Sequence, residues 1–194
     1  MNWVIDRVRV FHADEIEAAA ALLHTGGVLA YPTEGVYGLG CDPDDRVAFE
    51  RVFAMKRRPP EQGVLLIAAS LEQAMPWIGD APEAAFTRAN AIWPGAHTFI
   101  FPRSPRAPEW IAGGHSGIAL RVTAHAPSAS LCRAFGGPIV STSANRHGAP
   151  PAHSAADIGT IFGDEPDGVL DAPLGGLDRP TPITDAASGA IIRA

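Results

Sequence analysis

Residues 28–42 read VLAYPTEGVYGLGCD, and the pattern within them indicates an α/β fold. Residues 28–31 are a short apolar run of the kind that forms a buried strand, and Pro32 ends it. Thr33 and Glu34 follow at the strand end, where α/β proteins place side chains that contact ligands. The glycines after them predict a tight turn that a ligand can approach closely. An ordinary strand with a capped turn has the same pattern.

Apolar strand-like runs alternate with helical patterns along the rest of the chain. The predicted helices are residues 14–24, 45–56, a segment beginning at 70, 84–92, 127–135 and 154–162. The predicted strands are residues 28–31, 64–68, 97–101, 117–122, 138–140, 169–171, 182–185 and 190–193. Because the late strands are short and close together, we expect a twisted mixed parallel/antiparallel sheet flanked by helices. The length of 194 residues predicts a single α/β domain over residues 1–194.

Composition excludes several classes of protein. Hydrophobic residues make up 46% of the chain and charged residues 19%, which is typical of a globular protein. No apolar run approaches the roughly 20 residues of a membrane span, and the N-terminus lacks the apolar core of a signal peptide. Because no membrane span is predicted, we expect no contact with a membrane. Cys41 and Cys132 form no CxxC pair, so we also expect a reduced, cytoplasmic protein.

The charge is uneven along the chain. The net charge of −6 argues against a general nucleic-acid coat protein. Residues 84–156, however, contain six arginines, one acidic residue and five of the seven histidines. A basic segment in an acidic chain favours a local anion site, although chance clustering explains it equally well.

The common nucleotide and metal motifs are absent from the sequence. It contains no GxxxxGK[ST] phosphate loop, no GxGxxG, no HExxH, no GxSxG and no Cys/His cluster. The scattered histidines show no metal-ligand spacing, so no metal ligand is predicted. Arg121 interrupts the apolar strand IALRV, and a buried arginine needs either an ion-pair partner or a ligand.

The segment KRRPP, residues 56–60, is a candidate for binding phosphate or carboxylate. Its prolines predict an extended chain, in which alternate side chains share a face. Lys56 and Arg58 would then point together while Arg57 points away. Two convergent cations suit an anionic ligand, but a solvated basic helix end has the same sequence.

The segment STSAN, residues 141–145, follows a predicted buried strand. By the same alternation Ser141, Ser143 and Asn145 share one face, and Thr142 faces away. Three small hydrogen-bonding side chains in a row would form a polar pocket wall. An ordinary turn rich in serine and asparagine is the alternative.

Six motifs taken in order resemble the YrdC/TsaC family of threonylcarbamoyl-AMP synthases, in its short, single-domain form. They are PTEGVYGLGCD, KRRPPEQGVLLIAA, WPGAHTFIFP, IALRVTAH, PIVSTSANRHGAPP and RPTPITDAASG. The resemblance extends over nearly the whole chain, from about residue 14 to residue 193. It implies a YrdC-like α/β fold with a large, positively charged cleft.

The resemblance also implies a nucleotidyltransferase reaction. L-Threonine and bicarbonate give N-carboxythreonine, whose carboxylate attacks the α-phosphate of ATP to yield threonylcarbamoyl-AMP and pyrophosphate. Mg²⁺ is expected to arrive with ATP. The TsaD/TsaB/TsaE machinery would then transfer the threonylcarbamoyl group to the adenine beside the anticodon of tRNA, with at most a weak contact between this chain and tRNA.

Similarity assigns roles to particular residues. The family's Lys-x-Arg and Ser-x-Asn tetrad falls on Lys56, Arg58, Ser143 and Asn145, which are the predicted catalytic residues. The predicted substrate-binding residues are Thr33, Thr98, Arg121, Ser141, Arg179 and Thr181. Glu34 stands where many members have Asp, and Gly35 where many have Thr, which predicts looser threonine contacts on that side.

Two other functions are weighed against the synthase. A non-catalytic module could bind double-stranded RNA or tRNA in the cleft; the basic segment favours it and the net charge argues against it. The salt dependence of RNA affinity distinguishes the two. A carbamoyl-transfer enzyme of the same fold is disfavoured, because such enzymes are larger and contain several domains.

Overall fold

The computed structural model describes residues 8–58 and 63–194. Its strands are β1 (Arg9–Phe11), β2 (Leu29–Pro32), β3 (Tyr37–Gly40), β4 (Leu65–Ala68), β5 (Thr98–Pro102), β6 (Gly117–Val122), β7 (Ile139–Ser143), β8 (Gly168–Leu170), β9 (Ile183–Asp185) and β10 (Ile191–Arg193). Its α-helices are α1 (Ile16–His24), α2 (Arg46–Lys56), α3 (Leu71–Ala74), α4 (Glu83–Asn90), α5 (Glu109–Ala112), α6 (Ala126–Phe135) and α7 (Ala155–Phe162).

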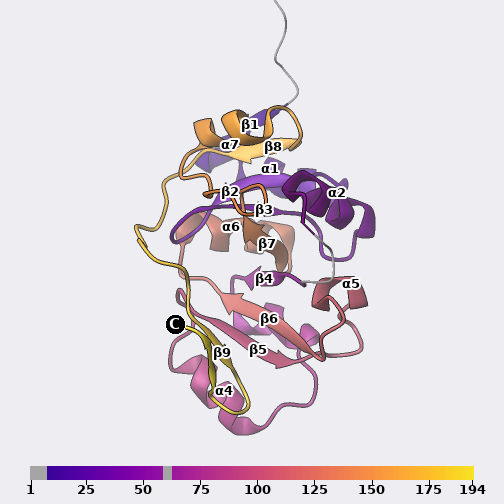
Figure 1. Ribbon diagram of the computed structural model, residues 1–194, viewed down its shortest axis with the longest axis vertical. Helices are drawn as coiled ribbons and strands as arrows, with labels where there is room; N and C mark the ends of the chain where they lie inside the picture. The colour runs from indigo at the N-terminus through magenta and orange to yellow at the C-terminus, as the bar shows by residue number, and fades with distance from the viewer. Residues whose placement is uncertain (1–7, 59–62) are drawn as a thin grey trace, which may run out of the picture.

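Within the described residues the strands form one sheet in the order β1-β8-β2-β3-β7-β4-β6-β5-β9-β10. Figure 1 shows this sheet running along the long axis of the molecule, with β1 and β8 at one end and β9 at the other. Four neighbouring pairs are parallel, namely β1/β8, β2/β8, β4/β6 and β5/β9, and the others are antiparallel. The predicted single α/β domain with a mixed sheet is therefore confirmed.

Helices cover both faces of the sheet because the strand residues alternate between two apolar cores. Leu29 and Tyr31 of β2 belong to the core that α1 and α6 cover, whereas Val28 and Ala30 belong to the core that α2, α4 and α7 cover. Burying one large apolar side chain contributes about 1.5–3 kcal/mol, so both faces stabilise the fold. Within the described parts of the chain, no helix is long and apolar enough to cross a membrane.

The two cysteines lie in these different cores. Cys41 belongs to the core under α2, and Cys132 belongs to the core under α1 and α6. Both are buried free thiols, and burial raises the pKa of Cys132 to about 12. The sheet separates the two sulfurs, which agrees with the expectation of unpaired cysteines.

The glycine-rich stretch after Thr33 corrects the sequence prediction. We expected one turn there, but residues 37–40 form β3, which pairs with β2 in an antiparallel hairpin. The turn is confined to the start, where Thr33 N donates to Val36 O at 3.0 Å. Gly38 and Gly40 alternate with core residues and let β3 lie against the Tyr31 ring, where a Cβ on Gly40 would come within 2.7 Å.

Two further elements were not predicted, β1 and α5. Each is only three or four residues long, too short for a periodic pattern to be visible in the sequence. The strand predicted at 138–140 is also longer than expected, since β7 extends through Ser143. That extension brings the STSAN segment into the sheet.

β7 joins the two halves of the sheet and has one open edge. β4 pairs with β7 up to Leu65, which lies opposite Ser141. Beyond that point Thr142 and Ser143 pair only with β3. The edge of β7 that faces β4 is therefore unpaired from Thr142 onward, within the described residues, and a large cavity opens beside it.

Candidate active site

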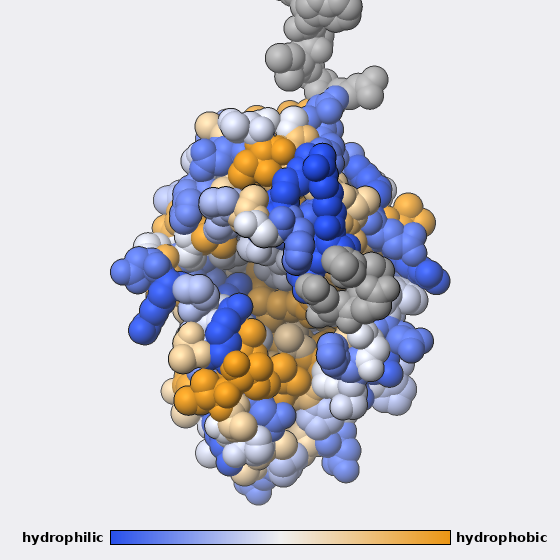
Figure 2. All heavy atoms as spheres, viewed as in Figure 1, coloured by the Kyte–Doolittle hydropathy of each residue, from blue (hydrophilic) through white to orange (hydrophobic). Residues whose placement is uncertain are grey.

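A cavity of about 1500 Å³ opens beside β7. Figure 2 shows a hollow near the middle of this face, with hydrophobic residues on its floor and below it and hydrophilic residues above it and to its left. The cavity exceeds the roughly 300–1,000 Å³ of an ordinary small-molecule pocket, so it has room for two substrates at once. Its charged lining residues are Arg58, Arg121, Arg179, Arg193, Asp178 and Asp185.

The structure brings most of the predicted site residues to this cavity. The predicted residues on its wall are Thr33, Arg58, Thr98, Arg121, Ser141, Ser143, Arg179 and Thr181. Lys56 and Asn145 are not on the wall, because both lie behind Ser143. The predicted residues therefore form one cluster in space, although they come from β5, β6, β7, the ends of β2, β7 and α2, and the chain before β9.

Lys56 holds the end of β7 from behind. Its Nζ donates to Asn145 O at 3.1 Å, to Asn145 Oδ1 at 3.0 Å and to the backbone oxygen of Ser143. Ser143 Oγ donates to the same Asn145 Oδ1 at 2.6 Å. The three side chains thus form a connected network, and Ser143 is its member on the cavity wall.

The geometry around Lys56 differs from the predicted extended segment. Lys56 is the last residue of α2, and Arg57 adopts a left-handed backbone conformation with φ of 51°. That helix end still turns Lys56 inward while Arg57 stays exposed, so the two side chains separate as expected but for a different reason. Pro59 and Pro60, on which the prediction depended, lie outside the described residues.

The environment of Lys56 makes its charge sensitive to pH. The residue is 3% exposed and its partners are neutral oxygens. Burial lowers the pKa of Lys56 to about 8, and the positive charge of Arg58 lowers it as well. An ammonium group with three neutral acceptors is therefore close to losing its proton under mildly basic conditions.

Arg58 lies on the cavity wall at the open edge of β7. Its guanidinium donates to Thr142 Oγ1 at 3.3 Å and to Gly63 O at 3.0 Å, and it lies 5.3 Å from the centre of the Phe53 ring. Partial burial lowers the pKa of Arg58. Thr142 was expected to face away from the site; it also lines the cavity, because the strand edge beside it has no partner among the described residues.

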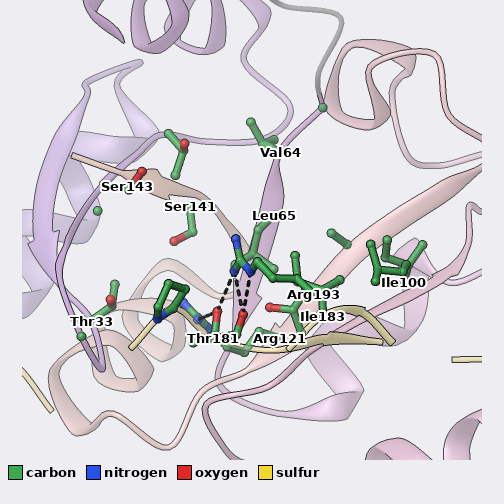
Figure 3. Close-up of a pocket in the computed structure, with 18 of the residues that line it drawn as sticks. Thr33, Val64, Leu65, Ile100, Arg121, Ser141, Ser143, Thr181, Ile183 and Arg193 are labelled. Carbon is green, nitrogen blue, oxygen red and sulfur yellow. Dashed lines mark hydrogen bonds between the residues drawn. The ribbon is translucent and has the colours of Figure 1, made fainter. Parts of the chain in front are cut away.

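Arg121 lies in a buried ion pair and also on the cavity wall. It is 5% exposed, and its Nη2 lies 3.5 Å from Glu34 Oε2. Its Nη1 donates to Thr181 Oγ1 at 3.2 Å. Figure 3 shows Arg121 and Arg193 approaching Thr181 from two sides, and Arg193 Nη2 donates to Thr181 O at 2.6 Å.

The remaining predicted residues, Thr33, Thr98, Ser141 and Arg179, are placed by the elements and segments that carry them. Thr33 Oγ1 donates to Val36 O at 2.7 Å and so closes the turn between β2 and β3. Thr98 begins β5 and is 2% exposed, and its backbone N–H donates to Pro182 O at 2.9 Å. Ser141 projects from β7 toward the cavity (Figure 3). Arg179 is an exposed residue of the segment that precedes β9.

Sequence reasoning missed Arg193 and Thr142 as cavity residues. Arg193 follows two isoleucines in a short predicted strand. An arginine within an apolar strand is the same signal that identified Arg121. No sequence signal marks Thr142. It reaches the cavity because β4 begins at Leu65 and therefore does not cover this part of β7. Among the residues that the structure describes, no group of three or more His, Cys, Asp or Glu side chains could hold a metal ion.

Among the described residues, a mixed ten-stranded sheet with a large, arginine-lined cavity beside β7 is typical of a YrdC-like α/β protein. The family model Sua5_yciO_yrdC, described as "Telomere recombination", matches residues 21–194. The chain belongs to this family. A relative from Alkalilimnicola ehrlichii named threonylcarbamoyl-AMP synthase is 52% identical over 182 residues, which are 92% of this chain and 95% of that protein.

Solved structures show the same fold. The crystal structure of P. abyssi Sua5 complexed with L-threonine matches with a TM-score of 0.85 and 30% identity, over 92% of this chain and 54% of that one. This chain thus spans about half the length of the P. abyssi protein. The structure of E. coli YciO matches with a TM-score of 0.84 over 96% of this chain and 95% of that one; at 24% identity it supports the fold alone.

Proposed function

We propose that this chain, as a single domain over residues 1–194, is a threonylcarbamoyl-AMP synthase. The amine of L-threonine combines with bicarbonate and loses water to give a carbamate. The carbamate oxygen then attacks the α-phosphorus of ATP, the bond to the β-phosphate oxygen breaks, and pyrophosphate leaves. The observation that carries the proposal is one cavity of about 1500 Å³ that collects eight predicted site residues, in a chain 52% identical to a protein of that name.

The charge of the cavity supports adenylylation. Among the described residues, four arginines line it against two aspartates, so we propose a positively charged cleft that neutralises the phosphate oxygens as charge moves onto pyrophosphate. In this scheme Arg58 and Ser143 contact phosphate, while Lys56 and Asn145 fix Ser143 from behind. No covalent intermediate is required, since positioning and charge stabilisation supply most of the catalysis.

We assign the two substrates to different walls. Arg121, Thr33 and Thr181 would hold threonine, with the guanidinium against its carboxylate and the hydroxyl groups beside it. Thr98, Ser141 and Arg179 would complete the contacts with threonine and nucleotide. The apolar lining offers a surface for the adenine ring; it includes Val64, Leu65, Ile100, Ile111, Ile183 and Ile192.

Mg²⁺ is proposed to arrive bound to the phosphates of ATP and to retain water ligands. The ion would neutralise phosphate charge. Among the described residues, the cavity wall offers only Asp178 and Asp185 as carboxylates, and the same residues contain no metal cluster, so we assign the ion no protein ligand.

Pyrophosphate release from ATP by the purified protein tests the proposal. We expect release that requires L-threonine, bicarbonate and Mg²⁺ together and that fails with glycine or L-serine. Release without threonine would indicate another acceptor for the adenylyl group. Absence of release from folded protein would overturn the synthase.

Delivery of the product completes the proposal. We propose that this enzyme works in the cytoplasm and passes threonylcarbamoyl-AMP to the TsaD/TsaB/TsaE machinery that modifies tRNA. Apart from the basic segment of residues 84–156, no observation favours the alternative of a non-catalytic RNA-binding module. Titration of tRNA at two salt concentrations separates the two: an RNA-binding module would bind tightly and lose affinity steeply with salt, whereas the synthase needs no more than weak binding.

A further inference from the structure

Glu34 lies behind the cavity wall and contacts both Arg121, within β6, and Thr123, the residue that follows β6. The residue is 7% exposed, and its Oε1 accepts a hydrogen bond of 2.6 Å from the Thr123 hydroxyl. Its Oε2 lies 3.5 Å from Arg121 Nη2. Glu34 is not among the residues that line the cavity, so any effect on a ligand must pass through Arg121 or through its neighbouring backbone.

The direction of these hydrogen bonds follows from their donors. The backbone N–H of His125 donates to Thr123 Oγ1 at 3.1 Å. Because a backbone N–H can only donate, Thr123 Oγ1 is the acceptor there, and its single hydrogen points to Glu34. The short bond that results is typical of a hydroxyl that donates to a carboxylate. Thr123, which is 2% exposed, therefore fixes the position of the Glu34 carboxylate.

The ion pair between Glu34 and Arg121 is incomplete. At 3.5 Å the two groups attract by charge without a good hydrogen bond. Glu34 Oε2 and Arg121 Nε are both buried and have no hydrogen-bond partner. Buried polar atoms of native proteins usually have partners, and exceptions need an explanation. Glu34 thus compensates the charge of Arg121, but the Nε of Arg121 remains without a hydrogen-bond partner.

The Glu34 backbone also anchors the segment that carries Thr181. Leu177 N donates to Glu34 O at 2.8 Å, and Gly175 packs so closely that a Cβ there would come within 2.9 Å of Glu34 Cα. Thr181, four residues beyond Leu177, accepts from Arg121. The position of Glu34 therefore influences both Arg121 and the hydroxyl beside it.

We propose that Glu34 and Thr123 are positioning residues that hold Arg121 at the cavity wall and set how tightly it binds the carboxylate of the amino-acid substrate. This inference rests on the proposed synthase function. Without the Glu34 carboxylate, or without the hydroxyl that orients it, Arg121 would lose its fixed place at the cavity wall. Binding of the amino-acid carboxylate would weaken, whereas ATP, bound at the other wall, would be little affected.

Steady-state kinetics of Glu34→Gln and Thr123→Val test this role, with L-threonine and L-threoninamide as the two amino substrates. The amide keeps the reacting amine but lacks the carboxylate. We expect both variants to raise KM for L-threonine by about tenfold and to leave KM for ATP within about twofold. The preference for L-threonine over L-threoninamide should fall by about tenfold, because only the acid uses the charge of Arg121.

Two matched variants serve as controls. Thr123→Ser keeps the hydroxyl that donates to Glu34 and should retain the wild-type KM for L-threonine. Glu50→Gln removes an exposed carboxylate that pairs with Arg46 on α2 and should leave all constants unchanged. Thermal unfolding of each variant verifies that it folds; if Glu34→Gln does not, Thr123→Val, which retains every charge, gives the decisive result.

The outcomes separate this inference from the proposed function. Wild-type protein without threonine-dependent turnover overturns both. Wild-type turnover together with an unchanged preference for L-threonine over L-threoninamide in both variants overturns the positioning role alone. An equal rise in KM for ATP and L-threonine also overturns it, since that pattern indicates a general loosening of the cavity.

Discussion

Lys56 and Asn145, 89 positions apart in the chain, are joined by two hydrogen bonds from one ammonium group. The Lys56 Nζ reaches the Asn145 backbone oxygen at 3.1 Å and its side-chain oxygen at 3.0 Å, and it also donates to Ser143 O. The three hydrogens of the ammonium group thus have three oxygen acceptors. Lys56 therefore ties the C-terminal end of α2 to the end of β7, where Ser143 faces the cavity.

Asn145→Asp should weaken this junction although the side chains have nearly the same shape. The Asn145 Nδ2 donates to Arg146 O at 2.9 Å and to Ala149 O at 2.8 Å. A carboxylate oxygen in its place would face two carbonyl oxygens without a hydrogen to donate. We expect a loss of about 1–3 kcal/mol in unfolding free energy, measured by urea denaturation. Equal stability of variant and wild type would show that these two bonds contribute nothing.

The activity should depend on the protonation of Lys56. Its pKa of about 8 predicts that turnover falls as the pH rises through 8, because the neutral amine has one hydrogen fewer for its three oxygens. Rates measured between about pH 6 and pH 10 test this. In Lys56→Arg the fall near pH 8 should disappear, since a guanidinium keeps its charge. A wild-type profile that is flat across this range would contradict the assignment.

The stability contribution of Lys56 should change in the opposite direction. Its pKa is lowered by burial from 10.5 in the unfolded chain to about 8 in the folded protein. Below pH 8 both states carry the proton, and the cost of burying the charge is fully present. Between about pH 8 and 10.5 the unfolded state binds more protons, so this contribution to the unfolding free energy rises with pH. Comparison of wild type with Lys56→Met at several pH values isolates it.

Arg58→Ala should reduce turnover by roughly a hundredfold, or about 3 kcal/mol, because a charged donor on the cavity wall is removed. Arg57→Ala is the matched control, since Arg57 is the exposed neighbour with its side chain outside the cavity. The control should retain wild-type turnover. Similar turnover in both variants would remove Arg58 from the mechanism and leave the fold assignment unaffected.

Two glycines predict opposite effects of adding one methyl group. A Cβ at Gly40 in β3 would lie 2.4 Å from Val140 O and 2.7 Å from Tyr31 Cε1, so Gly40→Ala should destabilise the protein by about 1–3 kcal/mol. Gly159 lies within α7 with nothing within 4 Å of the added atom. Gly159→Ala should therefore stabilise the protein by about 0.5–1 kcal/mol. Thermal unfolding of the two variants provides the comparison.

Local patterns in the sequence were sufficient for most helices and strands. The apolar runs at 64–68 and 117–122 predicted β4 and β6, because a buried strand needs hydrophobic residues on both faces. The same approach failed for β3, where Gly38 and Gly40 suggest a turn when they are considered alone. Their role is to make room for the Tyr31 ring of the neighbouring strand, and no local pattern carries that information.

The sequence by itself determined the fold class, the family and the residue types available for chemistry, because these depend on short-range patterns and on the order of motifs. Only the tertiary structure decided which of these residues reach the cavity. It places Arg58 and Ser143 on the wall with Lys56 and Asn145 behind them, and it adds Arg193 and Thr142. The physical reason is that β4 begins at Leu65, so its pairing with β7 stops at Ser141 and, among the residues that the structure describes, leaves an open strand edge. Contacts between residues about 90 positions apart depend on such strand boundaries, which a periodic pattern cannot specify.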